Sequence, residues 1–457
     1  MATRLPSFAE RSLAGRTSYS DSRFAGVTKV LFPETHKLLP QINQIYELDL
    51  AWGEFNTLTE SEIVERGAYF WSVRGTETNH YRICMRTPDQ VNATARRDRK
   101  NFFAANVFAV GYATHGLFPY RGKFHPQMVK AILNIMGIRP GMTVLDPMGG
   151  CGTTGIEATI MGLDSVLVEL SPFACLMSRA KVGALNCDCG AFAGLRLHAP
   201  ELFDELSTQF SASAERAPRL FSEAKQHKLG LGRQRSDSFP QETPSELREL
   251  MRLCFLDSVG YAERRANKKA RDLFPDVLGR YLDAVEAFNK VRKELELPLG
   301  MCRVVEGDAR SLQVEEASVD GILFSPPYSF AIDYLDNDLP QLNLLGIDAD
   351  RLRQSMIGLR GEGRNQEARV EARLREYFAD MRLVLRECNR VLRAGGFCTV
   401  VVGSNTNQTG GITLEDKLVE IARQEGLPLE FQIMREIEGI RNTMREEYLL
   451  FFRKPGE

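Results

Sequence analysis

A strand, a glycine-rich turn and a helix follow one another directly between residues 143 and 161. The strand is the apolar run at 143–148, the turn is Gly149-Gly150-Cys151-Gly152-Thr153-Thr154, and the helix covers residues 155–161. Glycines at such a turn let the backbone approach a ligand closely. The next apolar strand, at 165–170, contains Glu169 near its end, about 20 residues after the turn, where α/β nucleotide-binding folds hold a ribose diol. The spacing therefore predicts a cofactor that contains a nucleoside.

The rest of the chain continues this alternation of strands and helices. Further strands are predicted at 303–308, 319–328 and 397–402, and further helices at 127–136, 370–392 and 414–424. The helix at 370–392 is expected to stop at Gly395-Gly396. Two strands at 431–439 and 446–453 are expected to close the chain as an antiparallel pair. The alternation predicts an α/β fold with a Rossmann-like, mostly parallel sheet covered on both faces, and with an antiparallel C-terminal edge.

The 457 residues exceed what one hydrophobic core ordinarily serves, so several units are expected. Residues 1–26 are polar and rich in Ser and Arg, and we interpret them as a flexible tail. Residues 27–110 are predicted to form an N-terminal accessory segment with a helix at 60–66 and a strand at 69–73. The sheet domain is then predicted in two halves, 111–190 and 301–457. Between them, residues 191–300 show helical patterns without strand alternation, which predicts a helical insertion.

A second constrained segment follows the apolar run at 322–324. Two consecutive prolines cannot donate to a sheet ladder, so the strand must end at Ser325-Pro326-Pro327-Tyr328. The Ser325 hydroxyl and the Pro326 carbonyl become rigid acceptors at a strand's carboxyl end, and Tyr328 adds a flat aromatic face. Two acceptors and a stacking surface suit a planar ring with an exocyclic amino group, as in adenine, cytosine or guanine. The plain alternative is a proline turn after a core strand.

Composition argues against several other classes of protein. The net charge of −2 and the pI of about 6.4 do not fit a generally basic nucleic-acid coat, although basic clusters lie at 95–100 and 263–271. The nine cysteines form no C-x-x-C pair, so no metal site and no disulfide framework is expected. No apolar run reaches the roughly 18 residues of a membrane span, and the protein is predicted to be cytoplasmic.

Together, these segments resemble the amino-group DNA methyltransferases, which use S-adenosylmethionine to methylate N4 of cytosine or N6 of adenine. Residues 146–154, D-P-M-G-G-C-G-T-T, are similar to the family's D-P-F-x-G-x-G-T-T cofactor loop, with Met148-Gly149-Gly150 in place of the usual Phe-x-Gly. Glu169 matches the family's ribose acid, and Asp308 matches the acid that faces the cofactor adenine. The segment Ser325-Pro326-Pro327-Tyr328 matches the catalytic tetrapeptide, and residues 120–126 resemble the segment that closes over the methionine end.

The resemblance implies a class I methyltransferase fold with S-adenosylmethionine as its cofactor. The cofactor-binding residues that it implies are Asp146, Pro147, Gly149, Gly150, Gly152, Thr153, Glu169 and Asp308. The catalytic residues that it implies are Ser325, Pro326, Pro327 and Tyr328. In this order of motifs the family places target recognition in the insertion, here residues 191–300, and the target base must be flipped out or single-stranded.

Family members with S-P-P-Y rather than D-P-P-Y are mostly N4-cytosine enzymes. The resemblance therefore favours site-specific N4-cytosine methylation of DNA, with a possible restriction or phage-defence partner. The residues alone leave the base open, because a neutral serine accepts a hydrogen bond from either amine. An N6-adenine DNA methyltransferase, an RNA or tRNA base methyltransferase and a non-catalytic DNA-binding subunit remain alternatives. Carbon-5 cytosine methylation is excluded because the chain contains no Pro-Cys pair for the nucleophile.

Overall fold

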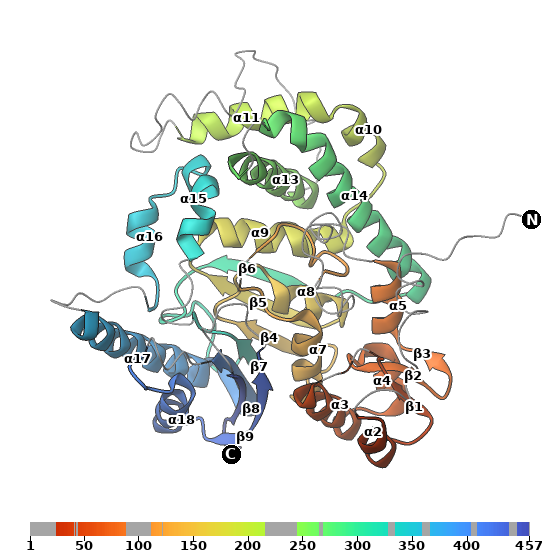
Figure 1. Cartoon of the computed structure of the whole chain (residues 1–457), viewed down its shortest axis with the longest axis vertical. Coiled ribbons are helices and arrows are strands. Elements are labelled where there is room, and N and C mark those ends of the chain that lie inside the picture. The colour runs from red at the N-terminus through yellow and green to blue at the C-terminus, as the bar shows by residue number, and fades with distance from the viewer. Residues whose placement is uncertain are drawn as a thin grey trace, which may run out of the picture.

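The computed structural model describes residues 24–40, 42, 44–87, 111–120, 122–214, 245–264, 268–327, 334–358, 366–403, 409–437 and 446–456. In this part of the chain, helices cover a central sheet, and a further group of helices is stacked beyond one end of it (Figure 1). Most of the predicted tail, the basic cluster at 95–100 and Tyr328 lie outside the described residues.

Seven strands form the central sheet, in the order β6-β5-β4-β7-β8-β10-β9. They are β4 Thr143–Asp146, β5 Asp164–Glu169, β6 Cys302–Glu306, β7 Val319–Phe324, β8 Leu392–Gly403, β9 Leu429–Glu436 and β10 Glu446–Arg453. All neighbours from β6 to β8 are parallel, whereas β10 is antiparallel to both β8 and β9. The order confirms the predicted mostly parallel sheet with an antiparallel C-terminal edge. It reverses between β4 and β7, and such switch points leave a crevice at the carboxyl ends of the strands.

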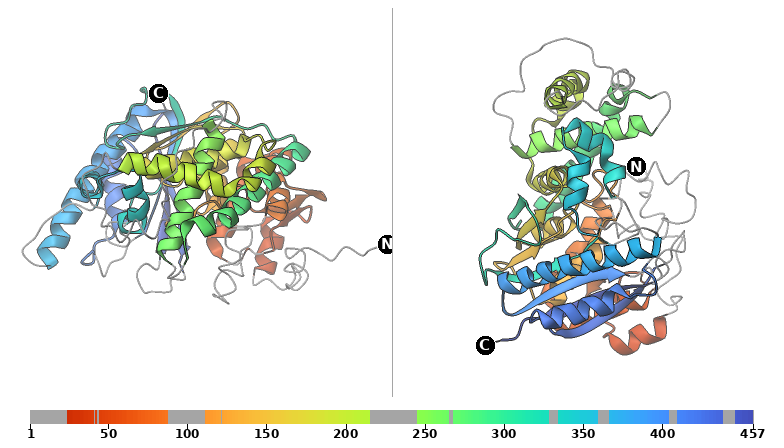
Figure 2. Two further views of the ribbon diagram at one scale, coloured as in Figure 1. Left: turned by 90° about the horizontal axis from the view of Figure 1, so that it is seen from above. Right: turned by 90° about the vertical axis from the view of Figure 1, so that its left-hand side faces the viewer.

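Both faces of this sheet are covered by helices. These helices are α7 Pro126–Ile135, α8 Thr153–Ile160, α9 Pro172–Gly183, α17 Gln366–Val391 and α18 Leu414–Gln424. Helices α15 Tyr334–Leu344 and α16 Ala349–Ser355 pack instead into the core of the helices at 192–295. Leu323 and Val401 are buried on the side of α7, while Ile322 and Val400 are buried on the side of α17 and α18. Figure 2 shows α17 and α18 side by side on their face. Burial on both sides explains why these strands are continuous apolar runs.

The glycine stop predicted after the long helix is wrong. Helix α17 ends at Val391, and β8 begins with the next residue, Leu392, so Gly395-Gly396 lies inside the strand element. Gly395 has a φ of +77°, and the pairing of β7 with β8 shifts register between Val319 and Gly321. The glycines therefore form an irregularity in a strand. A helix stop and a strand irregularity both use glycine's freedom at positive φ, and the local sequence does not distinguish them.

The N-terminal accessory segment folds into a small unit beside the sheet domain. It comprises α2 Ala25–Leu31, β1 His36–Leu38, α3 Ile45–Thr57, α4 Glu60–Arg66, β2 Phe70–Val73, β3 Thr76–Glu77 and α5 Asn79–Arg86. The predicted helix at 60–66 is present because Thr59 and Glu62 form a capping box at its start. Helix α3 packs on α7 and on β9, so the unit shares a hydrophobic core with the central sheet.

A buried carboxylate joins this unit to the sheet domain. Glu54 of α3 is fully buried and accepts hydrogen bonds from the backbone nitrogen atoms of Ala68 and Tyr69, at 2.8 and 3.1 Å. It also accepts one from Asn134 Nδ2 of α7, at 2.6 Å. Burial raises the pKa of Glu54 to about 7, although these three donors oppose the shift.

The described residues of the predicted insertion form helices and no strand. They are α10 Phe192–Leu197, α11 Ala199–Ala214, α13 Ser245–Glu263 and α14 Ala270–Leu295, the green and yellow-green group in Figure 1. Their shared core includes residues of α9, which lies against the sheet domain. No helix among the residues that the structure describes is long and apolar enough to cross a membrane. The nine cysteines are free thiols.

Replacing Glu54 by alanine should destabilise the fold strongly, because Ala68 N, Tyr69 N and Asn134 Nδ2 would each lose a buried acceptor. Each unsatisfied buried group costs about 1–3 kcal/mol, so we expect a loss of at least about 3 kcal/mol in the free energy of unfolding. Urea unfolding followed by circular dichroism measures it. Glu65→Ala, an exposed change on the neighbouring helix, is the control and should stay within about 0.5 kcal/mol of the wild type.

Candidate active site

A cavity opens where the carboxyl ends of four parallel strands meet. Asp146 ends β4, Glu169 ends β5, Asp308 follows β6 and Ser325 follows β7, and all four line this cavity. Of the residues implied by the resemblance, those that also line it are Pro147, Gly149, Gly150, Thr153, Pro326 and Pro327. The structure thus brings together residues that lie up to 181 positions apart in the chain, from 146 to 327.

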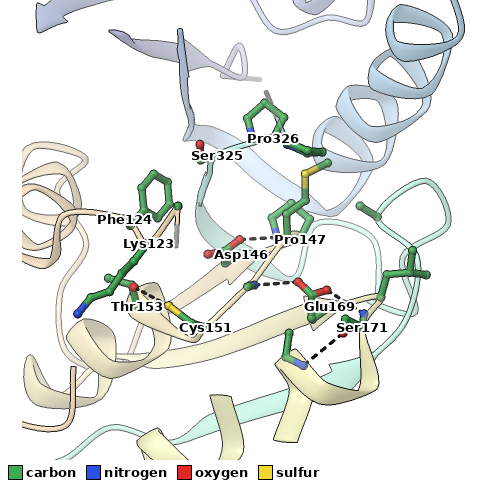
Figure 3. Close-up of a pocket in the computed structure, with 18 of the residues that line it drawn as sticks. Lys123, Phe124, Asp146, Pro147, Cys151, Thr153, Glu169, Ser171, Ser325 and Pro326 are labelled. Carbon is green, nitrogen blue, oxygen red and sulfur yellow. Dashed lines mark hydrogen bonds between the residues drawn. The ribbon is translucent and has the colours of Figure 1, made fainter. Parts of the chain in front are cut away.

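The glycine-rich turn is held by the carboxylate that precedes it. Asp146 Oδ1 accepts a hydrogen bond from Met148 N at 3.0 Å (Figure 3). Its Oδ2 accepts one from Thr154 Oγ1 at 2.6 Å. Burial raises the pKa of Asp146 to about 7, with hydrogen bonds from Thr154 and Met148 opposing the shift. Because this pKa is raised above its unfolded value, the residue stabilises the fold most at low pH, and that contribution is lost as pH rises through about 7.

The carboxylate at the end of the next strand holds the other side of the turn. Glu169 Oε2 accepts a hydrogen bond from Gly150 N, and Oε1 accepts one from Ser171 N, both at 2.8 Å (Figure 3). Burial raises the pKa of Glu169. Each carboxylate oxygen has a further lone pair, so these bonds leave acceptor capacity for a ribose diol. The predicted role of Glu169 on a ribose remains a prediction.

Gly152 is required by the geometry of the turn. It has a φ of +86°, and a Cβ at this position would lie 3.0–3.1 Å from Ser178 of α9. Both constraints disfavour any residue with a side chain. Gly149 and Gly150 line the cavity, whereas Gly152 does not. The role of Gly152 is to shape the turn at the start of α8.

Asp308 lies at the cavity wall but is bound by a residue that the sequence analysis did not identify. Arg310 donates to it from Nε and Nη2, at 2.9 and 2.6 Å, and from its backbone nitrogen. The same guanidinium reaches Asp380 of α17 at 3.0 Å. Met356 and Ile357 line the same end of the cavity as a partly apolar wall. The predicted contact of Asp308 with a cofactor adenine remains a prediction.

The tetrapeptide follows β7 as the double proline predicted. The strand ends at Phe324, and Ser325, Pro326 and Pro327 continue as an irregular segment along the cavity. Ser325 Oγ donates its proton to the carbonyl oxygen of Val401 in β8, at 2.9 Å. A hydroxyl has one proton, so toward any further partner the Ser325 oxygen acts as an acceptor. This arrangement suits an amine of a bound base. Tyr328 lies outside the described residues, and its stacking role stays a prediction.

The segment before α7 covers the cavity from the side opposite Glu169. Lys123, Phe124 and His125 line it, and Figure 3 shows Phe124 on the same side as Ser325. Lys123 does not point its ammonium at the glycine turn, because its Nζ donates to the carbonyl oxygen of His115, at 2.7 Å. This contact connects the covering segment to the buried cluster around Glu157.

Glu157 of α8 is the centre of a buried hydrogen-bond cluster beneath the site. Its Oε1 accepts from Tyr112 Oη at 2.5 Å and from His115 Nε2 at 2.6 Å, and its Oε2 lies 3.2 Å from Lys130 Nζ. Burial would raise the pKa of Glu157, but Lys130 and the bonds from His115 and Tyr112 outweigh it and lower the pKa to about 2. Burial lowers the pKa of His115 to about 4, so this imidazole is neutral at pH 7. The cluster fixes residues 111–120 against the helix that starts at the glycine turn.

Other cavity residues were also missed by the sequence analysis. Asp338 of α15 lines the cavity, and burial together with the charge of Glu169 raises its pKa to about 7. Arg435 and Glu447 reach the cavity from β9 and β10. An acid ten residues after Tyr328 is a weak signal for Asp338, and neither edge strand carries a motif that marks Arg435 or Glu447.

The cavity residues fit S-adenosylmethionine on three separate points. Two carboxylates, Glu169 and Asp338, lie where hydroxyl or ammonium groups of the cofactor could bind. The turn leaves space at the backbone of Gly150, and Met356 with Ile357 offers an apolar surface to a ring. The acids also suit the positive charge of the sulfonium.

A family model described as "UPF0020: RMKL-like, methyltransferase domain" matches residues 117–220. That range begins before the covering segment and includes the glycine-rich turn, Glu169 and the first helices of the insertion. It ends before β6 and the tetrapeptide.

Two curated proteins resemble parts of this chain. The type II methyltransferase M.MjaII of Methanocaldococcus jannaschii is 40% identical over 68 residues, which are 15% of this chain and 13% of that protein. The type II methyltransferase M.BsoBI of Geobacillus stearothermophilus is 19% identical over 293 residues, which are 52% of this chain and 54% of that protein. The chain thus matches about half or less of the length of each of these relatives.

Solved structures also resemble this one. TrmN from Thermus thermophilus is 16% identical, with a TM-score of 0.31, over 73% of this chain and 50% of that one. A SAM-dependent methyltransferase from Methanosarcina mazei is 10% identical, with a TM-score of 0.28, over 70% of this chain and 95% of that one. The sheet order, the glycine turn and the matched family model identify a class I methyltransferase fold whose cofactor is S-adenosylmethionine.

Replacing Gly152 by alanine should weaken cofactor binding, because the left-handed φ and the contact with Ser178 both require the turn to shift. A shift costing about 1–3 kcal/mol corresponds to a rise in the Kd for S-adenosylmethionine of roughly 5- to 150-fold. Isothermal titration calorimetry measures it. Gly194→Ala is the matched control, since an added Cβ there meets nothing within 4 Å, and its Kd should be that of the wild type.

Binding of S-adenosylmethionine should tighten as pH rises toward 8, because Asp338 and Asp146 both titrate at about 7 and their ionised forms attract the cofactor's positive charge. If one such ionisation is required, the Kd at about pH 6 should be roughly tenfold higher than at about pH 8. Titrations across this range test it. Asp338→Asn should bind more weakly at high pH and show a smaller pH slope, whereas Asp336→Asn, an exposed change on the same helix, should keep the full slope. An unchanged slope in Asp338→Asn would show that this acid does not sense the cofactor.

Proposed function

We infer that the protein transfers a methyl group from S-adenosylmethionine to the exocyclic amine of a base in DNA, with N4 of cytosine as the first candidate. The observation that carries the proposal is the placement of Ser325 and Pro326 on the wall of the cofactor cavity, with the serine proton donated to Val401. An oxygen used in this way can only accept from an incoming amine. M.MjaII and M.BsoBI, which resemble parts of this chain, are named type II methyltransferases. Their names support DNA as the proposed substrate.

The residues of this chain have a positioning task in the reaction. When bound, S-adenosylmethionine supplies a methyl group that is already activated. Ser325 Oγ and the Pro326 carbonyl would accept the two hydrogens of the base amine and orient its nitrogen toward the cofactor side of the cavity. Phe124, from the covering segment, and Tyr328 would hold the flat ring. Positioning and hydrogen bonding then lower the barrier without a covalent intermediate on the protein.

The amine proton that is lost needs no dedicated base on the protein. A methylated aromatic ammonium is a strong acid and releases its proton readily to water. His125 lines the cavity, but burial lowers its pKa far below the usual range, with Arg435 and Lys123 adding to the shift, so it is neutral at pH 7. This agrees with a reaction driven by orientation rather than by acid–base catalysis.

DNA must reach the cavity as a flipped or single-stranded base, because a base inside a duplex cannot enter such a site. The helical insertion and the exposed basic side chains of Arg264, Lys268 and Lys269 on it are our candidates for contacts with the target duplex. Target recognition by residues 191–300, a cytoplasmic location and a restriction or defence partner remain parts of the proposal. N6 of adenine is the alternative target, since the same two acceptors can hold its amine.

The test is methyl transfer from labelled cofactor to unmodified genomic DNA, followed by nucleoside mass spectrometry. We expect N4-methylcytosine with the wild type and a rate that is lower by on the order of 10²- to 10³-fold in Ser325→Ala, because one amine acceptor is lost. The cofactor Kd should not change in this variant. Ser318→Ala is the control, since the Ser318 hydroxyl donates to the carbonyl oxygen of Glu315 in a local turn and Ser318 does not line the cavity.

Each other outcome has a definite meaning. N6-methyladenine in place of N4-methylcytosine would keep the mechanism and correct the base. Label in RNA and none in DNA would contradict the proposed substrate. Cofactor binding without methyl transfer to either nucleic acid would favour a non-catalytic DNA-binding role.

A further inference from the structure

The cavity continues past the tetrapeptide toward the antiparallel edge of the sheet. Phe124, Met128, Arg435 and Glu447 line it, and the last two come from β9 and β10, which follow β7 and β8 toward that edge. Arg435 lies near the carboxyl end of β9, and Glu447 lies opposite it at the start of β10 in the strand register. These two charged groups are part of neither the glycine turn nor the tetrapeptide. They lie at the end of the cavity that we assign to the target base.

Arg435 is held in place by two neighbouring side chains. Its Nη1 lies 3.0 Å from Glu447 Oε2, and its guanidinium lies 5.1 Å from the centre of the Tyr46 ring of α3. Its side chain keeps 23% of its surface exposed, and Glu447 keeps 9%. An ion pair and a stacked aromatic ring on a rigid hairpin hold the planar group in one orientation. Glu447 balances the positive charge of Arg435 locally. Arg435 therefore adds little repulsion toward the positive charge of the cofactor.

Part of the guanidinium has no hydrogen-bond partner. Arg435 Nε is buried and bonds to nothing among the residues that the structure describes. A buried donor without an acceptor costs about 1–3 kcal/mol, so an acceptor supplied by a ligand in the cavity would stabilise this group. Arg435 lines the same cavity as Ser325 and Pro326, which would hold a base amine.

The two candidate bases differ in what they place beside that amine. Cytosine presents N3 and O2, two acceptors in a row after its N4 amine, whereas adenine presents N1 followed by a C2–H group. A guanidinium offers a planar fork of donors that matches two adjacent acceptors. Adenine can satisfy one of these donors and leaves the other against a C–H.

We propose that Arg435, held by Glu447 and Tyr46, binds the ring edge of the target base next to its reactive amine and selects cytosine over adenine. The proposal rests on the proposed function, since it names the group that reads the base held by Ser325 and Pro326. It makes Arg435 a substrate-binding residue, and it makes Glu447 and Tyr46 positioning residues. It also gives the N-terminal unit, which supplies Tyr46, a part in the active site.

The test compares Arg435→Lys and Arg435→Gln with the wild type. Lysine keeps the positive charge beside Glu447 but lacks the planar fork, so it should fold while losing the paired contact. The matched control is Arg453→Gln, because Arg453 also stacks on an aromatic ring, Phe397 at 5.1 Å, and pairs with Glu430 on the same hairpin but lies outside the cavity. Thermal unfolding of every variant checks the fold.

Three readouts are taken: the Kd for S-adenosylmethionine, kcat and KM on DNA, and the ratio of N4-methylcytosine to N6-methyladenine. In both Arg435 variants we expect kcat/KM on DNA to fall by roughly 10- to 100-fold, the effect of one lost bidentate contact. The cofactor Kd should stay within about twofold. The preference for cytosine should fall by a factor similar to the loss in kcat/KM, and Arg453→Gln should match the wild type in all three readouts.

Other results would overturn the inference. A rise in cofactor Kd as large as the loss in kcat/KM would place Arg435 on the methionine carboxylate of the cofactor. A lower kcat/KM with an unchanged base ratio in folded Arg435→Lys would assign it to the DNA backbone or to the fold alone. In both cases the proposed function stands, because the wild type still methylates DNA. If the wild-type protein methylates no base, that result contradicts the proposed function itself, and the inference about Arg435 is then wrong as well.

Discussion

Two carboxylates at neighbouring strand ends, the buried Asp146 and the half-buried Glu169, hold the glycine-rich turn, and the site depends on this arrangement. Asp146 bonds Met148 N and Thr154 Oγ1, and Glu169 bonds Gly150 N. The two acids come from β4 and β5, which are parallel and paired. The turn therefore takes its shape from the sheet as well as from its glycines. Desolvation raises the pKa of both acids, which places the ionisation of Asp146 near pH 7, where the site would work.

Buried acids also connect the parts of the molecule that surround the cavity. Glu157 binds Tyr112, His115 and Lys130, and so fixes the segment before α7 to the helix that starts at the turn. Glu54 plays the same part for the N-terminal unit, which it joins to α7 through Asn134. A buried carboxylate with several donors is stable only when every donor is in place. These acids therefore make the site and its supports one cooperative structure.

Much of the sheet domain could be predicted from local patterns. The apolar runs at 143–148, 165–170 and 397–402 coincide with β4, β5 and β8 because strands buried on both faces need continuous apolar side chains. The double proline ended β7 at Phe324 as expected. The glycine stop at 395–396 failed because glycine permits both a helix end and a strand irregularity. The N-terminal unit was largely unassigned, since α5 has only 8 residues, fewer than the window of about 11–18 residues over which helical periodicity is read.

The sequence by itself determined the local chemistry of this protein: a strand that must stop at two prolines, a turn that only glycine permits, and acids after two apolar strands. Only the tertiary structure decided which of these groups share a cavity, and it added Asp338, Arg310, Arg435 and Glu447. It also showed that Asp308 is bound by Arg310 and that Ser325 gives its proton to Val401. Strand order and register set these contacts, because the partners lie on strands and helices that meet only when the sheet forms. The spacing of the residues along the chain does not predict them.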